Sequence, residues 1–163
     1  MIVTKEDIIL ILEEVKDPEV PAISVVELGI VRDVHLKGDE IQVDITPTYS
    51  GCPANKVIEN TILSTLKSNG YENSTVQIVY SPPWTTDWIT EKGKKKLKEY
   101  GIAPPGATEN EDWSPFGNLN RVVPCPFCDS ENTKLTSEFG STACKSLYYC
   151  DSCHQPFEHF KCV

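Results

Sequence analysis

The sequence predicts an α/β domain with the element order αββαβα, a small mixed sheet with helices, followed by a small C-terminal β unit. Two observations support this prediction. In roughly the first hundred residues, apolar positions alternate between the three-to-four spacing of helices and the two-residue spacing of strands. Of seven cysteines, only Cys52 lies in the first 120 residues. We therefore expect an α/β domain at 1–103, a proline- and glycine-rich linker at 104–121, and a cysteine-rich unit at 122–163.

The first predicted element is a helix that ends before Pro18. Its apolar residues share one face, and they are Ile8, Ile11, Leu12 and Val15. Thr4 and Asp7 are spaced like a capping box, which predicts the start of the helix. Asp17 precedes a proline, and such a residue avoids the helical region, which predicts the end.

The remaining elements of this domain follow from the same two spacings. Alternating apolar residues predict two strands joined as a hairpin by the turn Lys37-Gly38-Asp39, and a third strand that runs through Tyr80. Glycines just past two helical patterns predict where those helices end. The predicted strands and helices, in chain order, are 31–36, 41–45, 53–69, 76–80 and 90–100.

Charge and hydropathy exclude several classes of protein. The net charge of -9 and the pI near 4.8 argue against a partner that is a nucleic acid or an anionic membrane. No apolar run approaches the about 18 residues of a membrane span. The first fifteen residues carry four acids and no basic region, so a signal peptide is not expected. We therefore expect a cytoplasmic protein, in which cysteines bind metals or act as thiols rather than form disulfides.

Two CxxC pairs predict a metal site in the second unit. Their cysteines are Cys125, Cys128, Cys150 and Cys153, and 21 residues separate the pairs. Two such turns supply four thiolates, the ligand set of a structural Zn²⁺, so we expect a zinc ribbon. The alternatives are four unligated structural cysteines or a redox pair, although neither pair follows a strand in a thioredoxin-like pattern. His154 and His159 are alternative ligands, but such histidines are more often surface residues.

Two further cysteines of the ribbon are predicted to face each other. If the chain reverses at the second CxxC pair, Cys144 and Cys162 lie opposite across antiparallel strands. Such a thiol pair could bind a second metal or form a redox-sensitive bond. It could equally consist of two small buried side chains.

In the first domain, Cys52 occupies the turn between a predicted strand and a predicted helix that begins at Pro53. Unpaired N–H groups and the positive end of the helix dipole lower the pKa of a thiol in this position. The alternative is a buried structural cysteine. A thiol enzyme would also need a general base, and His35, the only histidine in the domain, lies in a predicted strand.

The last predicted helix carries an unusual number of bases for an acidic chain, namely Lys92, Lys94, Lys95, Lys96 and Lys98. A solvated helix face is the ordinary explanation, because exposed lysines are common. A docking surface for an acidic partner is the alternative.

Asp17-Pro18-Glu19 together with Gly51-Cys52-Pro53 resembles the metal–sulfur cluster assembly domain of iron–sulfur carriers and assembly factors. Segments from both units resemble the PaaD family, an accessory component of ring-1,2-phenylacetyl-CoA epoxidase in aerobic phenylacetate degradation. These segments are DPEVPAISVVELGIVR (17–32), TPTYSGCPA (46–54), PWTTDWI (83–89), YGIAPP (100–105), SEFGSTACKSLYYCDSC (137–153) and PFEHFKC (156–162).

The resemblance implies an accessory protein without catalytic residues. It implies that Asp17 and Glu19 lie beside Cys52, and that these residues handle a transient iron–sulfur cluster. The two carboxylates would raise the pKa of the thiol, so the net direction of its shift stays open. The implied partners are the epoxidase subunits, above all the iron–sulfur flavin reductase. The alternatives are a general iron–sulfur carrier outside this pathway and a zinc-ribbon interaction module.

Overall fold

The computed structural model describes residues 2–106 and 122–161. Contacts divide the chain into two compact units, Met1–Gly93 and Lys94–Val163, and each unit is described by itself. Most of the predicted linker, and Cys162, lie outside the described residues. The predicted boundaries after residues 103 and 121 therefore stay predictions. Within the described residues, no helix is both long and apolar enough to cross a membrane.

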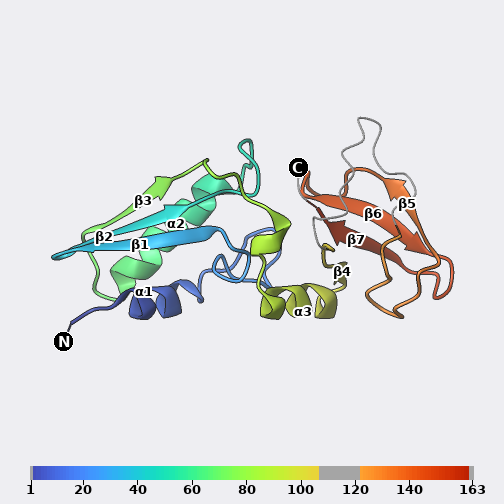
Figure 1. The fold of residues 1–163 in the computed structure, drawn as a ribbon, viewed down its shortest axis with the longest axis horizontal. Helices are drawn as coiled ribbons and strands as arrows, with labels where there is room; N and C mark the ends of the chain where they lie inside the picture. Colours follow the sequence, from blue (N-terminus) through green and yellow to red (C-terminus); the bar gives the residue numbers. More distant parts are fainter. Residues whose placement is uncertain (1, 107–121, 162–163) are drawn as a thin grey trace. The chain divides into compact units, whose positions relative to one another are not determined.

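The first unit has the predicted element order, with one short 3₁₀ helix added (Figure 1). The elements are α1 (Lys5–Leu12), β1 (Val31–Lys37), β2 (Glu40–Ile45), α2 (Asn55–Ser68), β3 (Ser74–Ile78), η1 (Thr86–Trp88) and α3 (Glu91–Glu99), of which α3 continues into the second unit.

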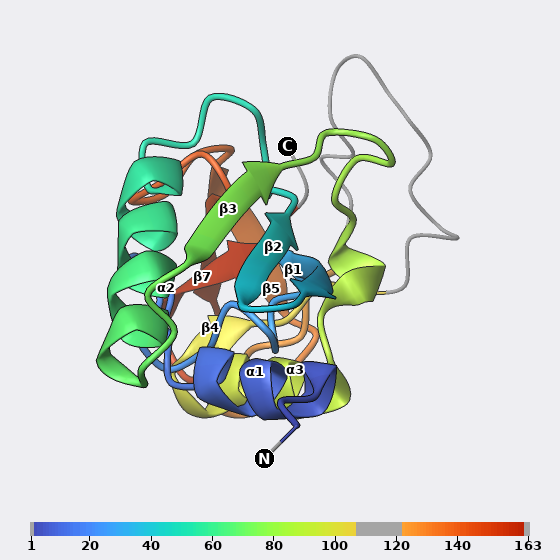
Figure 2. The ribbon, with the colours of Figure 1, turned by 90° about the vertical axis from the view of Figure 1, so that its left-hand side faces the viewer.

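The sheet of the first unit is mixed, as predicted. β1 and β2 form an antiparallel hairpin, whereas β2 and β3 run parallel with Val43 opposite Val76. The strand order is β1-β2-β3 (Figure 2). Ile41, Val43 and Ile45 of β2 are buried on one face, and the residues between them are polar and half-buried. The sheet therefore buries one face and leaves the other polar.

The helices begin and end somewhat differently from the prediction. Thr4 and Asp7 form the expected capping box, in which the Asp7 N–H donates to Thr4 Oγ1 at 3.3 Å and the Thr4 N–H donates to Asp7 Oδ2 at 2.9 Å. However, α1 ends at Leu12, and Val15 is buried in the turn beyond it. The spacing of seven residues from Ile8 to Val15 thus correctly indicated that Val15 is buried, but not that it belongs to the helix. Tyr80 lies past the end of β3 and is 56% exposed.

The loop from Leu28 to Ile30 packs against the segment around η1. The indole N–H of Trp84 donates to the Leu28 carbonyl at 2.9 Å, and the Arg32 guanidinium lies 3.4 Å from the ring centroid of Trp88. Gly29 has φ +75°, and a Cβ atom there would lie 2.4 Å from the Trp88 carbonyl oxygen. Only glycine allows this close approach of two backbone segments.

The second unit contains a four-stranded sheet in the order β4-β7-β6-β5. The strands are β4 (Ile102–Ala103), β5 (Thr133–Ser137), β6 (Lys145–Cys150) and β7 (Pro156–Phe160). β5, β6 and β7 are antiparallel neighbours, with Ser146 opposite His159, whereas β4 pairs parallel with β7. A small core lies under this sheet and includes Tyr148 and Phe157, whose rings stack at 5.7 Å. The β zinc ribbon predicted for this region is the fold observed.

Candidate metal centre and the Cys52 site

The four cysteines of the CxxC pairs converge in the second unit. Their sulfur atoms all lie within 4.8 Å of one another. The Sγ atoms of Cys125 and Cys153 are 3.7 Å apart, and those of Cys128 and Cys150 are 3.6 Å apart. A tetrahedron with Zn–S bonds of about 2.3 Å has S···S edges of about 3.8 Å. The donor set and its spacing therefore fit a structural zinc ion.

The two CxxC turns have the same backbone geometry. In each turn, the carbonyl of the first cysteine accepts a hydrogen bond of 2.9 Å from the residue four positions later, Asp129 in one turn and His154 in the other. These donor residues follow the second cysteine, and both are left-handed, with φ 59° and 58°. A 2.8 Å hydrogen bond between the hydroxyls of Ser130 and Ser152 joins the turns. The sequence thus builds two equivalent half-sites.

Backbone amides support negative charge on the sulfurs. N–H groups of Cys153 and Ser152 lower the pKa of Cys150 to about 7, whereas burial raises the pKa of Cys153 to about 12. Thiols that share one small space cannot all ionise without a counter-charge. A bound dication supplies that charge, so metal binding releases protons and becomes weaker as the pH falls.

Neither histidine of the ribbon belongs to the four-cysteine group. His154 is exposed, and its Nδ1 atom lies 3.5 Å from the Tyr149 hydroxyl. His159 is 4% exposed, and its ring meets the edge of Tyr148. The expectation of a surface position is therefore wrong for His159, because β7 packs this side chain into the ribbon.

Cys144 lies just before β6 and is buried, with its sulfur 3.1 Å from the Thr142 hydroxyl. Its carbonyl accepts a 2.8 Å hydrogen bond from the Lys161 N–H, so the antiparallel pairing of β6 and β7 includes one more residue before β6 and one more after β7. Because Cys162 lies outside the described residues, the proposed thiol pair stays a prediction.

Cys52 lies in the loop between β2 and α2, where the carboxyl ends of the parallel strands β2 and β3 meet. Open α/β sheets bind ligands at this end. The helix begins two residues later than predicted, with Ala54 as its N-cap. The Ala54 N–H still interacts with the Cys52 sulfur, and the Tyr49 side chain forms a further hydrogen bond with it. The thiol is half-buried rather than fully enclosed.

Asp17 and Glu19 occupy the turn after α1, and both act electrostatically on Cys52. The structure thus places both carboxylates close enough to influence the thiol. Asp17 is buried, and its Oδ1 accepts hydrogen bonds from the Glu19 N–H at 2.8 Å and the Val20 N–H at 2.9 Å. Asp17 therefore holds the turn that carries Glu19.

The net direction of the pKa shift of Cys52, which the sequence leaves open, is upward in the structure. Burial raises the pKa of the thiol above its usual value, and Glu19 and Asp17 raise it further. Hydrogen bonds from Ala54 and Tyr49 lower the pKa of the thiol, but by less than burial and the two carboxylates raise it. The free thiol is consequently protonated at neutral pH, and a metal would have to displace its proton.

We predict that Cys52 reacts slowly with iodoacetamide at neutral pH, because only the thiolate is nucleophilic. The rate should rise throughout the neutral range and reach half its maximum above the pH of an ordinary cysteine. Glu19→Gln should move this profile to lower pH, whereas Glu40→Gln, at the start of β2, should leave it unchanged. Mass spectrometry of the Cys52 peptide from zinc-loaded protein gives the rate. A profile at or below that of free cysteine would contradict the assignment.

Sequence reasoning missed Tyr49. The Cys52 N–H donates to the Tyr49 carbonyl at 3.2 Å, which closes the turn that brings the phenol to the sulfur. The segment Tyr-Ser-Gly-Cys, with an aromatic residue three positions before the cysteine in a glycine turn, was the available signal.

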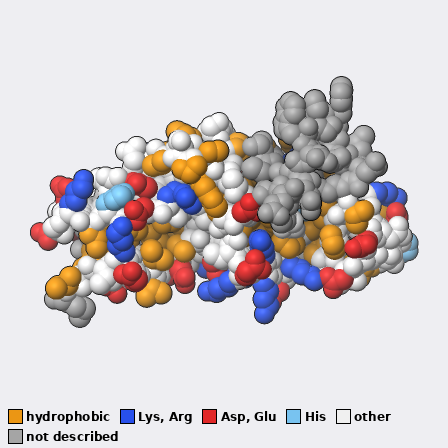
Figure 3. Space-filling view, viewed as in Figure 1, with side chains coloured by type: hydrophobic (Ala, Val, Ile, Leu, Met, Phe, Trp, Pro, Cys, Tyr) orange, Lys and Arg blue, Asp and Glu red, His pale blue; other side chains and the backbone are white. Residues whose placement is uncertain are grey.

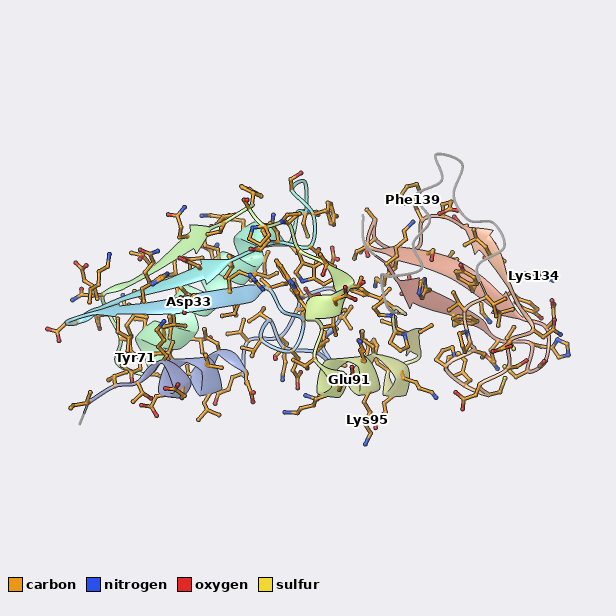
Figure 4. All side chains as sticks on the ribbon, viewed as in Figure 1. Asp33, Tyr71, Glu91, Lys95, Lys134 and Phe139 are labelled. Atoms are coloured by element: carbon orange, nitrogen blue, oxygen red, sulfur yellow. The ribbon has the colours of Figure 1, made fainter. Side chains whose placement is uncertain are left out.

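His35 lies on the polar face of the sheet, between two carboxylates. Its Nε2 atom is 2.8 Å from Asp44 Oδ2, and its Nδ1 atom is 3.9 Å from Asp33 Oδ2. Asp33 is labelled on β1 in Figure 4. These contacts connect His35 to neighbouring strand residues and give no support to a role as base for Cys52.

Several lysines of α3 have acidic partners. Lys92 lies 3.3 Å from Glu27, and Lys98 forms an ion pair with Asp129. Lys95 is 4.0 Å from Glu99, and its side chain extends away from the helix (Figure 4). Figure 3 shows acidic side chains among the basic ones over this helix. The arrangement favours a solvated helix face over a dedicated docking surface.

Comparison with known proteins gives matches for both units. Residues 5–78 match the family described as iron-sulfur cluster assembly protein, and residues 107–161 match the PaaD zinc beta ribbon domain. Among solved structures, a domain of unknown function DUF59 from Bacillus anthracis is 29% identical with a TM-score of 0.54. The match covers 57% of this chain and 90% of that one.

Two curated relatives show how much of this chain is similar in sequence to known proteins. A Fe-S protein maturation auxiliary factor from Bacillus subtilis (strain 168) is 35% identical over 57% of this chain and 92% of its own length. A protein of Escherichia coli (strain K12), named as the D subunit of 1,2-phenylacetyl-CoA epoxidase, is 44% identical over 94% of this chain and 90% of its own length. That likeness spans both units. The chain therefore belongs to the PaaD family, that of the D subunit of 1,2-phenylacetyl-CoA epoxidase.

Proposed function

We propose that the chain is an accessory protein of iron–sulfur cluster assembly that serves 1,2-phenylacetyl-CoA epoxidase in aerobic phenylacetate degradation. The observation that carries the proposal is the grouping of Cys52, Tyr49, Asp17 and Glu19 in a unit matched by the cluster-assembly family. Joined to it is a ribbon characteristic of the PaaD family. The client is the iron–sulfur flavin reductase of the same system.

The geometry suits transient handling of a cluster. Cys52 supplies one half-buried sulfur, and a single protein thiolate leaves the other positions of an iron free for new ligands. The hard oxygen ligands of Asp17 and Glu19 would hold iron less tightly than further thiolates. A cluster bound in this way can be passed on. The proposed role is therefore transfer, without a catalytic residue and without resident iron.

The ribbon has a separate task in this proposal. Its four cysteines would hold Zn²⁺ with no open position, so zinc would stabilise the fold and take no part in chemistry. None of the described cysteines forms a disulfide, which suits the proposed location in the reducing cytoplasm.

The test is co-expression of Cys52→Ala with the epoxidase subunits. We expect the reductase purified from these cells to contain several-fold less iron and acid-labile sulfide per flavin, because the thiol that would carry the cluster is missing. Ser50→Ala, in the same loop, is the matched control and should give full loading. Zinc content and circular dichroism of both variants should equal those of the wild type. Full cluster loading with Cys52→Ala would refute the proposal.

A general carrier role is the second candidate. It is favoured because the first unit alone matches the Bacillus subtilis auxiliary factor over 92% of that protein's length. If this role is correct, deleting the gene should lower cluster loading in iron–sulfur proteins outside phenylacetate degradation. If the epoxidase role is correct, only the reductase should be affected.

A further inference from the structure

The two edges of the sheet in the first unit differ in charge. β1 carries Arg32, Asp33 and Lys37, and its register is interrupted by a bulge between Val31 and Asp33. Charges and bulges are devices that protect an edge strand from pairing with another chain. β3 has the sequence Ser-Thr-Val-Gln-Ile, without a charge, a proline or a bulge. Of the two edges, only β3 lacks these protective features.

The backbone of β3 presents a regular row of hydrogen-bonding groups on its outer side. The Asn73 carbonyl and the Val79 N–H bond to β2, so the odd-numbered residues face inward. Because successive residues of a strand point their N–H and C=O groups to opposite sides, those of Ser74, Val76 and Ile78 face outward. Among the described residues no strand pairs with this edge. Figure 2 shows β3 as the border of the sheet.

The side chains of β3 are also less well covered than those of its neighbour. Val76 and Ile78 lie on the buried face of the sheet but are only half-buried, whereas Val43 and Ile45 opposite them are fully buried. Another strand beside β3 would cover this remaining apolar surface. Hydrogen bonding and burial therefore both favour an added strand.

We propose that two copies of this chain pair through β3, antiparallel, around a two-fold axis at Val76. In this register Val76 lies opposite its own copy and Ser74 lies opposite Ile78, so all the outward groups of both strands find partners. The strand is self-complementary, because its five residues are uncharged and its outward residues are placed symmetrically about the centre. The two sheets join into one of six strands.

The proposed register makes a second specific pairing on the solvent face. There Thr75 lies opposite Gln77 of the second copy, and this pair occurs twice. Gln77 now donates its side-chain amide to the Ile78 carbonyl at 3.2 Å, a contact that pairing would replace. Both side chains are exposed in the single chain, so they can be exchanged without disturbing the core.

The experiment compares two double variants with the wild type by sedimentation equilibrium of the zinc-loaded full chain across the micromolar range. Thr75→Lys with Gln77→Lys places like charges opposite each other twice, whereas Thr75→Glu with Gln77→Lys places opposite charges there. The two variants share Gln77→Lys and differ only in the residue at position 75. We expect a concentration-dependent dimer of the wild type, and a dimer at least about tenfold tighter in the Glu/Lys variant than in the Lys/Lys variant at low salt.

Two outcomes would overturn the proposal. One is a wild-type chain that stays monomeric at every concentration. The other is a dimer whose dissociation constant is the same in both variants, since such a dimer would use another surface. Equal unfolding midpoints of the dilute variants show that both monomers are folded. Because the readout is association alone, the result is independent of the proposed role in cluster assembly.

Discussion

Cys128→Ser is expected to release the zinc ion and to unfold the ribbon, while the first unit keeps its fold. The core of the ribbon is small. One hydrophobic cluster consists of Ala103, Val123, Cys125, Tyr148, Cys150 and Phe157, of which two are proposed ligands, and Ile102, Cys144 and Phe160 are buried as well. Binding of structural zinc supplies about 10–16 kcal/mol in comparable small units, which exceeds what such a core provides. Without the metal, the strands should lose their fixed packing.

Zinc per chain and near-UV circular dichroism measure this effect. Tyr148 and Tyr149 lie in β6, so their dichroism follows the ribbon. Trp84 and Trp88 lie in the first unit, whereas Trp113 does not, so tryptophan emission in a Trp113→Phe background provides the separate check on that unit. Cys144→Ser is the matched control, because Cys144 is buried but lies outside the four-sulfur group. Normal zinc content and dichroism in Cys128→Ser would show that the four-cysteine assignment is wrong.

Gly29→Ala is expected to destabilise the first unit by more than about 3 kcal/mol. A left-handed residue with a side chain costs about 1–2 kcal/mol. In addition, the new Cβ atom would lie 2.4 Å from the Trp88 carbonyl oxygen and 2.6 Å from the Trp88 Cβ atom. The clash involves backbone, so relief requires η1 to move away from the loop, at the expense of the packing around Trp84.

The variant Gly38→Ala separates the cost of the left-handed backbone from the cost of the clash with Trp88. Gly38 also has a positive φ, of 62°, but a Cβ atom there meets nothing within 4 Å. This variant should lose only about 1 kcal/mol, the cost of the left-handed backbone. Urea titrations followed by tryptophan emission give both free energies of unfolding. Equal losses in the two variants would mean that contact with Trp88 has no energetic role.

The sequence predicted the elements whose signal is local. Apolar spacing, a capping box and a two-strand turn specify α1, β1 and β2, because each depends on residues a few positions apart. The convergence of the four cysteines was also predictable, since each CxxC turn is a local structure that orients two sulfurs. That they bind zinc stays a proposal.

The remaining features depend on contacts distant in sequence. β4 contains two residues and exists only because β7 lies beside it, so no pattern in the sequence reveals it. The net direction of the pKa shift of Cys52 could not be predicted for the same reason. Its position before a helix is local, but burial and the charge of Glu19 come from the folded chain.

The pairing of β4 with β7 determines where a gene fragment for the second unit has to begin. A fragment that starts at the linker would lack Ile102 and Ala103, and the backbone of β7 at Glu158 and His159 would be unpaired on the side away from β6. A freshly exposed strand edge invites aggregation during expression. Starting at Thr90 keeps β4 and all of α3, together with the hydroxyl that accepts the Gly93 N–H at 3.0 Å. Solution spectroscopy on the isolated ribbon would be best attempted with that fragment.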